Sequence, residues 1–380
     1  MDGVSQPDQI NPDAVKKFRS GKRSSHTTAE LVDGILAGNR TLLSRAITLV
    51  ESSLPAHRKQ AQEVIAGCLE HLARIQDTCS PPFVGRGRGR GSEQHSASSI
   101  QHPASIRVGI TGVPGVGKST FIEALGKHLT GMGHKLAVLA IDPSSSRSKG
   151  SILGDKTRME ELSVDPNAFI RPSPSAGSLG GVARKTRETI ILCEAAGFDV
   201  IFVETVGVGQ SETAVHSMVD FFLLLMLAGA GDELQGIKRG IIEMADAIVI
   251  NKADGDNIGK ARLAMREYAN ALHLFPPPSG GWTPVVDTCS SRTKAGIGNV
   301  WNIIMQYRDA MSASGFFAQR RREQNRNVLY ETIEEELRRN FYSRKEIAQA
   351  MVRAEKEIME GRANPYEAAL ELIRKSGSHH

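Results

Sequence analysis

A glycine-rich loop in the first half of the chain has the residue types that bind a phosphate. The loop reads Gly112-Val113-Pro114-Gly115-Val116-Gly117-Lys118-Ser119-Thr120 and matches the pattern G-x-x-x-x-G-K-[ST]. Its glycines let backbone N–H groups turn toward a phosphate without hindrance from a Cβ atom. The spacing predicts that Lys118 reaches the β- and γ-phosphates of a nucleotide and that Ser119 ligates Mg²⁺.

A second motif predicts which base the nucleotide carries. Asn251-Lys252-Ala253-Asp254 follows an apolar run and matches the N-K-x-D pattern with which GTPases read guanine. The Asp254 carboxylate can accept two hydrogen bonds, from N1–H and from the exocyclic amine of guanine, and adenine lacks this pair of donors. Ser290-Ser291-Arg292 follows the next apolar run, where GTPases place a backbone contact to the base. The two motifs together predict binding of Mg·GTP.

Two acidic residues lie between these motifs, each at the end of an apolar run. Asp142 closes the run 136–141, and Glu204 closes the run 200–203 and begins Glu204-Thr205-Val206-Gly207. A carboxylate at such a position can face Mg²⁺ directly or through a water. The alternative for either residue is helix capping or an ordinary carboxylate at a strand end. The Gly207 amide could sense the γ-phosphate, which makes 208–212 a candidate switch.

The elements that must position these motifs follow from hydrophobic patterning. Short apolar runs alternate with helical stretches between residues 105 and 311, and several runs are apolar on both faces. The runs are Ile106–Ile110, Leu136–Ile141, Ala168–Ile170, Val200–Val203, Phe221–Leu227, Ala247–Ile250 and Pro284–Val286. This pattern predicts an α/β fold with a doubly wound, mostly parallel P-loop NTPase sheet and helical N- and C-terminal extensions. All the motifs fall at the carboxyl ends of the strands, where such sheets bind ligands.

The chain divides by composition around this predicted GTPase domain at 105–311. Residues 1–26 are polar and expected to be disordered, 27–79 to be helical, and 80–104 to form a linker or loop. Residues 312–375 are predicted to form a helical arm, and 376–380 resemble a tag remnant. The S/T-x-x-E pattern predicts capping boxes at Thr27 and Ser343, and Asn39 and Asn364 are further predicted caps.

The composition argues against several other classes of protein. The formal net charge is +5 over 380 residues, and aromatic residues make up 5%. The basic runs 86–90 and 320–322 are therefore interpreted as a solvated linker and a solvated helix face, with no nucleic-acid partner. The longest apolar run, 221–230, is too short to cross a membrane, and the N-terminus has no signal peptide. Four widely spaced cysteines favour reduced thiols and a cytoplasmic protein. His216 is expected to be structural.

Several long stretches of the chain, taken together, resemble one known family. The stretches are Gly112–Thr120, Asp142–Ser145, Leu153–Met159, Arg171–Pro174, Val203–Glu212 and Gly231–Gly240. In this order they are similar to the MeaB/MMAA group, also called ArgK-like, of the G3E GTPases. The similarity extends over residues 28–375 and is densest within 105–310.

The resemblance implies a G-protein chaperone of an adenosylcobalamin-dependent acyl-CoA mutase. Such proteins gate cofactor loading and use GTP hydrolysis to protect or reactivate the mutase. It also implies a homodimer that uses the C-terminal helices as its arm. Asp142, Asp155 and Glu204 fall at the family's Mg²⁺-linked acids, and Gly231–Gly240 falls at a mobile loop that transmits nucleotide state. Lys118, Glu204, Asp155 and Lys238 are the expected catalytic residues.

Two departures and three alternatives remain open. The segment 80–104 is longer and more basic than the family pattern, and Ser290-Ser291-Arg292 replaces the commoner S-A. A metal-insertion GTPase is disfavoured because the sequence has no His- or Cys-rich segment that could bind the metal. A P-loop kinase or transport ATPase is disfavoured by the guanine motif, and a scaffold with a vestigial site by the intact Lys118 and Ser119. The sequence leaves the identity of the mutase open.

Overall fold

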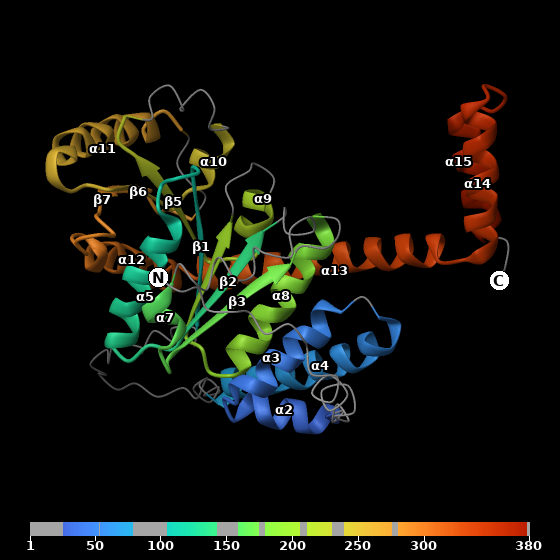
Figure 1. Ribbon diagram of the computed structural model, residues 1–380, viewed down its shortest axis with the longest axis horizontal. Helices are drawn as coiled ribbons and strands as arrows, with labels where there is room; N and C mark the ends of the chain where they lie inside the picture. Colours follow the sequence, from blue (N-terminus) through green and yellow to red (C-terminus); the bar gives the residue numbers. More distant parts are fainter. Residues whose placement is uncertain are drawn as a thin grey trace, which may run out of the picture.

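The computed structural model describes residues 26–52, 54–78, 105–142, 159–174, 179–205, 211–229, 239–275 and 280–377. Its centre is a seven-stranded, all-parallel sheet with strand order β3-β2-β4-β1-β5-β6-β7 (Figure 1). The strands are β1 (Ile106–Gly112), β2 (Leu136–Asp142), β3 (Ala168–Pro174), β4 (Val200–Thr205), β5 (Phe221–Leu227), β6 (Ala247–Asn251) and β7 (Val285–Thr288). Each predicted apolar run forms one of these strands, so the predicted doubly wound α/β fold is confirmed.

Helices cover both faces of this sheet because successive strand residues point to opposite sides. The helices within this part of the chain are α5 (Lys118–Gly131), α7 (Glu160–Ser163), α8 (Leu179–Ala195), α9 (Ser211–His216), α10 (Arg239–Met244), α11 (Ile258–Leu272) and α12 (Ile297–Ala313), with a 3₁₀ turn η1 (Gly255–Asn257). Val108 and Phe202 lie in a core that includes residues of α5 and α12, whereas Ile201 and Val203 face a core with α8. A smaller core under α10 and α11 contains Met226.

Three N-terminal helices form an additional layer against α8. These are α2 (Thr28–Leu36), α3 (Arg40–Glu51) and α4 (Pro55–Thr78), and α3 and α4 contact α8 directly (Figure 1). The Thr27 hydroxyl accepts from the Glu30 N–H and the Glu30 carboxylate accepts from the Thr27 N–H, so the predicted capping box is confirmed. Asn39 also caps α3 as predicted, through Thr41 and Leu42.

The C-terminal helices leave the body of the molecule. They are α13 (Phe316–Tyr342), α14 (Lys345–Met359) and α15 (Pro365–Gly377), and α14 and α15 stand away from the sheet at the far end of α13 (Figure 1). The capping box predicted at Ser343 is wrong: α13 continues to Tyr342, so Ser343 ends that helix and Arg344 begins the next without a side-chain cap. The predicted cap at Asn364 is confirmed by its bond from the Tyr366 N–H, 2.9 Å.

The first half of α13 is fixed to the sheet by buried ion pairs. Arg321 donates to both carboxylate oxygens of Asp220, at 2.9 and 2.6 Å, and its guanidinium lies 4.9 Å from the centre of the Phe317 ring. Arg320 forms an ion pair of 3.6 Å with Asp246. The prediction that 320–322 is a solvated helix face is therefore wrong for Arg320 and Arg321, whose acidic partners lie at the amino end of β5 and just before β6.

No helix in the described part of the chain is long and apolar enough to cross a membrane. The apolar run that the sequence predicts as a buried strand is β5, whose first six residues are buried.

Candidate functional site

The predicted phosphate loop joins the end of β1 to the start of α5. A Cβ atom on Gly112 would lie 2.4 Å from the Leu225 carbonyl oxygen, so only glycine fits beside β5. Gly115 and Gly117 have φ of +78° and +90°, the left-handed region that glycine enters without strain. Helix α5 begins at Lys118 with no side-chain cap. Its first N–H groups therefore have no side-chain cap and can bind an anion.

Lys118 lies folded over this loop. Its Nζ donates to the carbonyl oxygens of Gly112, at 2.8 Å, and Val113, at 3.3 Å. Burial lowers the pKa of Lys118, and the nearby charges of Glu204 and Glu212 act in the opposite direction. A desolvated ammonium that faces carbonyl oxygens is well placed to exchange them for a charged phosphate, because charge-assisted hydrogen bonds are stronger.

Asn251 connects the predicted base-reading motif to the phosphate loop. Its side chain is 1% exposed, and its Nδ2 donates to the Val116 carbonyl oxygen at 2.9 Å. Its Oδ1 accepts from the Ser291 N–H at 3.2 Å and from the Ser291 hydroxyl at 2.9 Å. The buried amide therefore holds three separate segments of the chain in one arrangement.

The other residues of the two base-reading motifs lie together at the same edge of the sheet. The Asp254 carboxylate accepts a short hydrogen bond from the Ser290 hydroxyl, which fixes its orientation. Lys252 donates to the Gly115 carbonyl oxygen at 2.8 Å and has a φ of +59°, uncommon for a residue with a Cβ. The Arg292 side chain is exposed, as is that of Thr120 on the first turn of α5.

The acidic residues Glu204 and Asp142 lie at the ends of β4 and β2. Glu204 is 9% exposed and pairs in register with Ile110 of β1 and Ala140 of β2. The neighbouring Thr205 hydroxyl donates to the Thr111 hydroxyl at 2.8 Å, so the ends of β4 and β1 are tied together. The backbone of Asp142 ends β2 at the same edge. The side chain of Asp142, the candidate residues Asp155 and Lys238, and most of the loop 231–240 lie outside the described residues.

The sequence placed Glu212 only at the end of the candidate switch 208–212 and did not predict its charge near Lys118. Glu212 is 2% exposed in the first turn of α9, and its charge acts on Lys118 together with that of Glu204. The signal available in the sequence was an acidic residue shortly after the glutamate that ends β4. Its partner Lys118 is distant in sequence, so only the fold reveals their proximity.

The oxygen donors at this edge suit a magnesium ion. Ser119 contributes a hydroxyl and Glu204 a carboxylate, and hard oxygen ligands of this kind are those that Mg²⁺ prefers. Within the described residues, no three histidine, cysteine, aspartate or glutamate side chains are grouped to hold a metal. A Mg²⁺ site here would therefore depend on the hydroxyl, on nucleotide oxygens and on Asp142 or Asp155.

Comparisons with known proteins agree with this geometry. The sequence model of a family described as "Methylmalonyl Co-A mutase-associated GTPase MeaB" matches residues 96–346. The chain is 46% identical over 350 residues to the mouse (Mus musculus) protein "Methylmalonic aciduria type A homolog, mitochondrial", covering 92% of this chain and 80% of that one. It is 44% identical over 317 residues to "GTPase ArgK" of Escherichia coli, covering 83% and 87%. A solved structure described as an LAO/AO transport system kinase matches with a TM-score of 0.65 and 34% identity, over 92% of this chain and 98% of that one.

Proposed function

The chain belongs to the family of methylmalonyl-CoA mutase-associated GTPases and is itself a GTPase, and on this premise we propose that it is the G-protein chaperone of an adenosylcobalamin-dependent acyl-CoA mutase. In this role it gates loading of the mutase with its cofactor, and it protects or reactivates the mutase through GTP hydrolysis. The observation that carries the proposal is the buried Asn251 amide, which joins the phosphate loop to the base-reading loop. The loop that binds the base and the loop that binds the phosphates are thereby held together as one rigid unit.

Each part of the nucleotide has a proposed partner. Lys118 and the N–H groups of the loop bind the β- and γ-phosphates, because they combine a charge with aligned donors. Asp254, held by Ser290, accepts from the two donors of guanine. The backbone of the segment Ser290-Ser291-Arg292 is proposed to contact the base from the opposite loop.

Ser119, Glu204, Asp142 and Asp155 are the residues that we propose to hold Mg²⁺. When bound, the ion neutralises charge on the β- and γ-phosphates. Glu204 is anchored for this purpose at the end of a central strand, between β1 and β2. Asp155 and Lys238 are further proposed catalytic residues, on segments that follow β2 and β5.

The mutase is proposed to contact the loop Gly231–Gly240. This segment has three glycines and four charged residues in ten positions, so it can change shape at low cost and bind differently in the two nucleotide states. It follows β5, and the Gly112 that begins the phosphate loop lies directly against Leu225 of that strand. The strand that leads into this segment therefore contacts the start of the phosphate loop directly.

A homodimer is proposed from the surface of the C-terminal arm. Large apolar side chains lie exposed along all three helices: Leu329, Tyr330, Ile333, Leu337, Tyr342, Val352, Met359, Tyr366, Leu370 and Ile373. On α13 the four-residue spacing of Leu329, Ile333 and Leu337 places them on one face. Exposed apolar side chains along one helix face are typical of an interface, and a second copy offers the same surface in a two-fold arrangement.

The compartment proposed for the protein is the cytoplasm. The three described cysteines, Cys68, Cys193 and Cys289, are buried free thiols. Free buried thiols are typical of a reducing compartment.

The second candidate is a phosphotransferase, because one matched structure is described as a transport system kinase. The guanine-reading arrangement around Asp254 favours the GTPase instead. Competition of GTP and ATP for the unmodified protein separates the two: equal competition supports the kinase reading.

Steady-state GTP hydrolysis tests the chaperone proposal. The rate is measured for the protein alone and in the presence of purified methylmalonyl-CoA mutase. The Lys118→Ala variant controls for contaminating phosphatases. We expect slow intrinsic hydrolysis that the mutase accelerates, as ordering of switch segments by a partner does in other GTPases. A rate unchanged by this mutase and by other adenosylcobalamin-dependent acyl-CoA mutases would contradict the chaperone role.

A further inference from the structure

Helix α9 lies between the nucleotide site and the arm. Its first turn carries Glu212, buried close enough to Lys118 for their charges to interact. Its last residue is His216, and Ser217 follows directly. His216 contacts Arg320 of α13, and Ser217 contacts Arg187, which in turn binds Glu331 of α13. The short helix therefore carries a charge that acts on Lys118 at one end and contacts the arm helix at the other.

The first contact joins His216 to Arg320. Arg320 Nη2 lies 3.1 Å from His216 Nε2, and the imidazole packs edge-on against Phe222 at 5.5 Å. Burial lowers the pKa of His216 to about 4, and the charge of Arg320 acts in the same direction. The ring is therefore neutral at neutral pH, and its Nε2 can accept a hydrogen bond from the guanidinium. Arg320 is held in turn by a bond of 2.9 Å to the Tyr307 hydroxyl and by its ion pair with Asp246.

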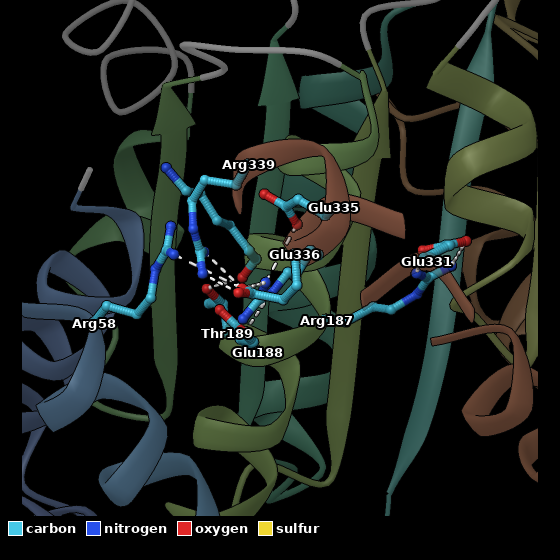
Figure 2. A network of polar contacts seen from close by, with 10 residues as sticks. Arg58, Arg187, Glu188, Thr189, Glu331, Glu335, Glu336 and Arg339 are labelled. Atoms are coloured by element: carbon cyan, nitrogen blue, oxygen red, sulfur yellow. Dashed lines mark hydrogen bonds and ion pairs between the residues drawn. The ribbon is translucent and has the colours of Figure 1, made fainter. Parts of the chain in front are cut away.

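The second contact runs through Arg187 of α8. Arg187 Nη2 donates to the Ser217 hydroxyl at 2.7 Å and to Glu331 of α13 at 3.3 Å, and Nη1 donates to the other Glu331 oxygen. The Ser217 hydroxyl donates back to the Ala214 carbonyl of α9 at 2.7 Å. Figure 2 shows Arg187 turned toward Glu331, apart from the cluster around Glu336. One guanidinium therefore binds the end of α9 and the arm helix at once.

We propose that α9 couples the nucleotide site to the arm, with Arg187 and Arg320 as the two links to α13. The inference rests on the proposed function, because the arm is assigned there to the interface between two copies. A γ-phosphate that binds Lys118 adds negative charge where the charge of the buried Glu212 carboxylate also acts. The two nucleotide states therefore place different forces on the first turn of α9, which is the differential interaction that coupling requires.

Hydrogen exchange of the full-length protein tests this coupling. Exchange of the peptide that spans 329–342 is compared with GDP and with a non-hydrolysable GTP analogue bound. We expect the two states to differ about fivefold in rate, the lower end of usual coupling strengths. Ser217→Ala and Glu331→Ala each remove one partner of Arg187, and each is expected to reduce this difference, while the link through Arg320 preserves part of it. The double variant is expected to lose no more than either single variant.

Glu335→Ala is the matched control. Glu335 lies on the same helix and accepts from Arg184 at 3.3 Å, within the separate cluster that Figure 2 shows with Glu188 and Glu336. This variant removes an ion pair of α13 without touching the link to α9, so it should keep the nucleotide-dependent difference. No difference in the parent protein, an undiminished difference in both test variants, or an equal loss in the control would each overturn the coupling.

Nucleotide binding and mutase stimulation are measured on the same samples, which separates the two proposals. A protein that responds to the mutase but shows no nucleotide dependence in 329–342 refutes the coupling alone. A protein with the expected exchange pattern and no response to any mutase supports the coupling and refutes the chaperone role.

Discussion

Replacement of Asn251 by alanine should loosen the nucleotide site more than any single contact suggests. The amide makes a hydrogen bond of 2.9 Å to the Val116 carbonyl and accepts two, at 3.2 and 2.9 Å, from Ser291. Asn251→Ala leaves the Val116 carbonyl and the Ser291 N–H without this partner in a buried position. Each such orphan costs about 1–3 kcal/mol, so together they cost about 2–6 kcal/mol. Entry of a water would bring the loss toward the lower value.

This loss should divide between stability and affinity. The free energy of unfolding, measured in urea, should fall by about 2 kcal/mol or more, and calorimetry should show GDP binding weakened by about tenfold or more. Asn257→Ala is the control, because Asn257 makes one exposed bond of 2.7 Å to the Lys252 carbonyl. It should cost no more than about 1 kcal/mol. If Asn251→Ala matches the parent within about 0.5 kcal/mol in both measurements, the bridging role of the amide is refuted.

Four further changes test other parts of the account. Lys118→Ala should abolish GTP hydrolysis and weaken GTP binding by about 1.5–3 kcal/mol in calorimetry, because a charge-assisted contact is lost; near-normal turnover would contradict the phosphate-loop assignment. Asp254→Asn should remove the preference for GTP over ATP in a competition assay, since an amide accepts less strongly from the two guanine donors. Burial raises the pKa of Glu194, but the charge of Arg107 and its hydrogen bonds outweigh this and lower the pKa from 4.5 to about 2. The folded state then binds fewer protons than the unfolded state. About 3 kcal/mol of the free energy of unfolding, present above pH 4.5, is therefore lost as the pH falls toward 2. Glu194→Gln should flatten this part of the plot of unfolding free energy against pH. Leu337→Asp should yield monomers in sedimentation, whereas Glu346→Gln on the same arm should not, and a dimer that persists in Leu337→Asp would place the interface elsewhere.

The sheet and its ligand-binding edge could be predicted because their signals are local. Parallel strands buried on both faces need continuous apolar runs such as 221–227, and a phosphate loop needs its glycines at fixed spacing. Those positions could therefore be read without knowledge of distant contacts. The same holds for the caps at Thr27 and Asn39, whose partners lie within three residues.

Most features that escaped prediction depend on partners distant in the sequence. Arg320 and Arg321 look like a solvated basic run, but Asp246 and Asp220 lie at strand starts that α13 crosses only in the folded protein. Glu212 likewise meets Lys118 only after β1 and β4 have paired. The capping prediction at Ser343 was wrong for a local reason, because helix α13 continues to Tyr342.

The two nucleotide states of this protein should differ in their affinity for a mutase. The most direct measurement is calorimetric titration of methylmalonyl-CoA mutase into the protein bound to GDP and to a non-hydrolysable GTP analogue. We predict dissociation constants that differ by about fivefold or more, because a nucleotide can drive a partner only through a difference in affinity between states. Equal dissociation constants, or no binding in either state, would contradict this prediction.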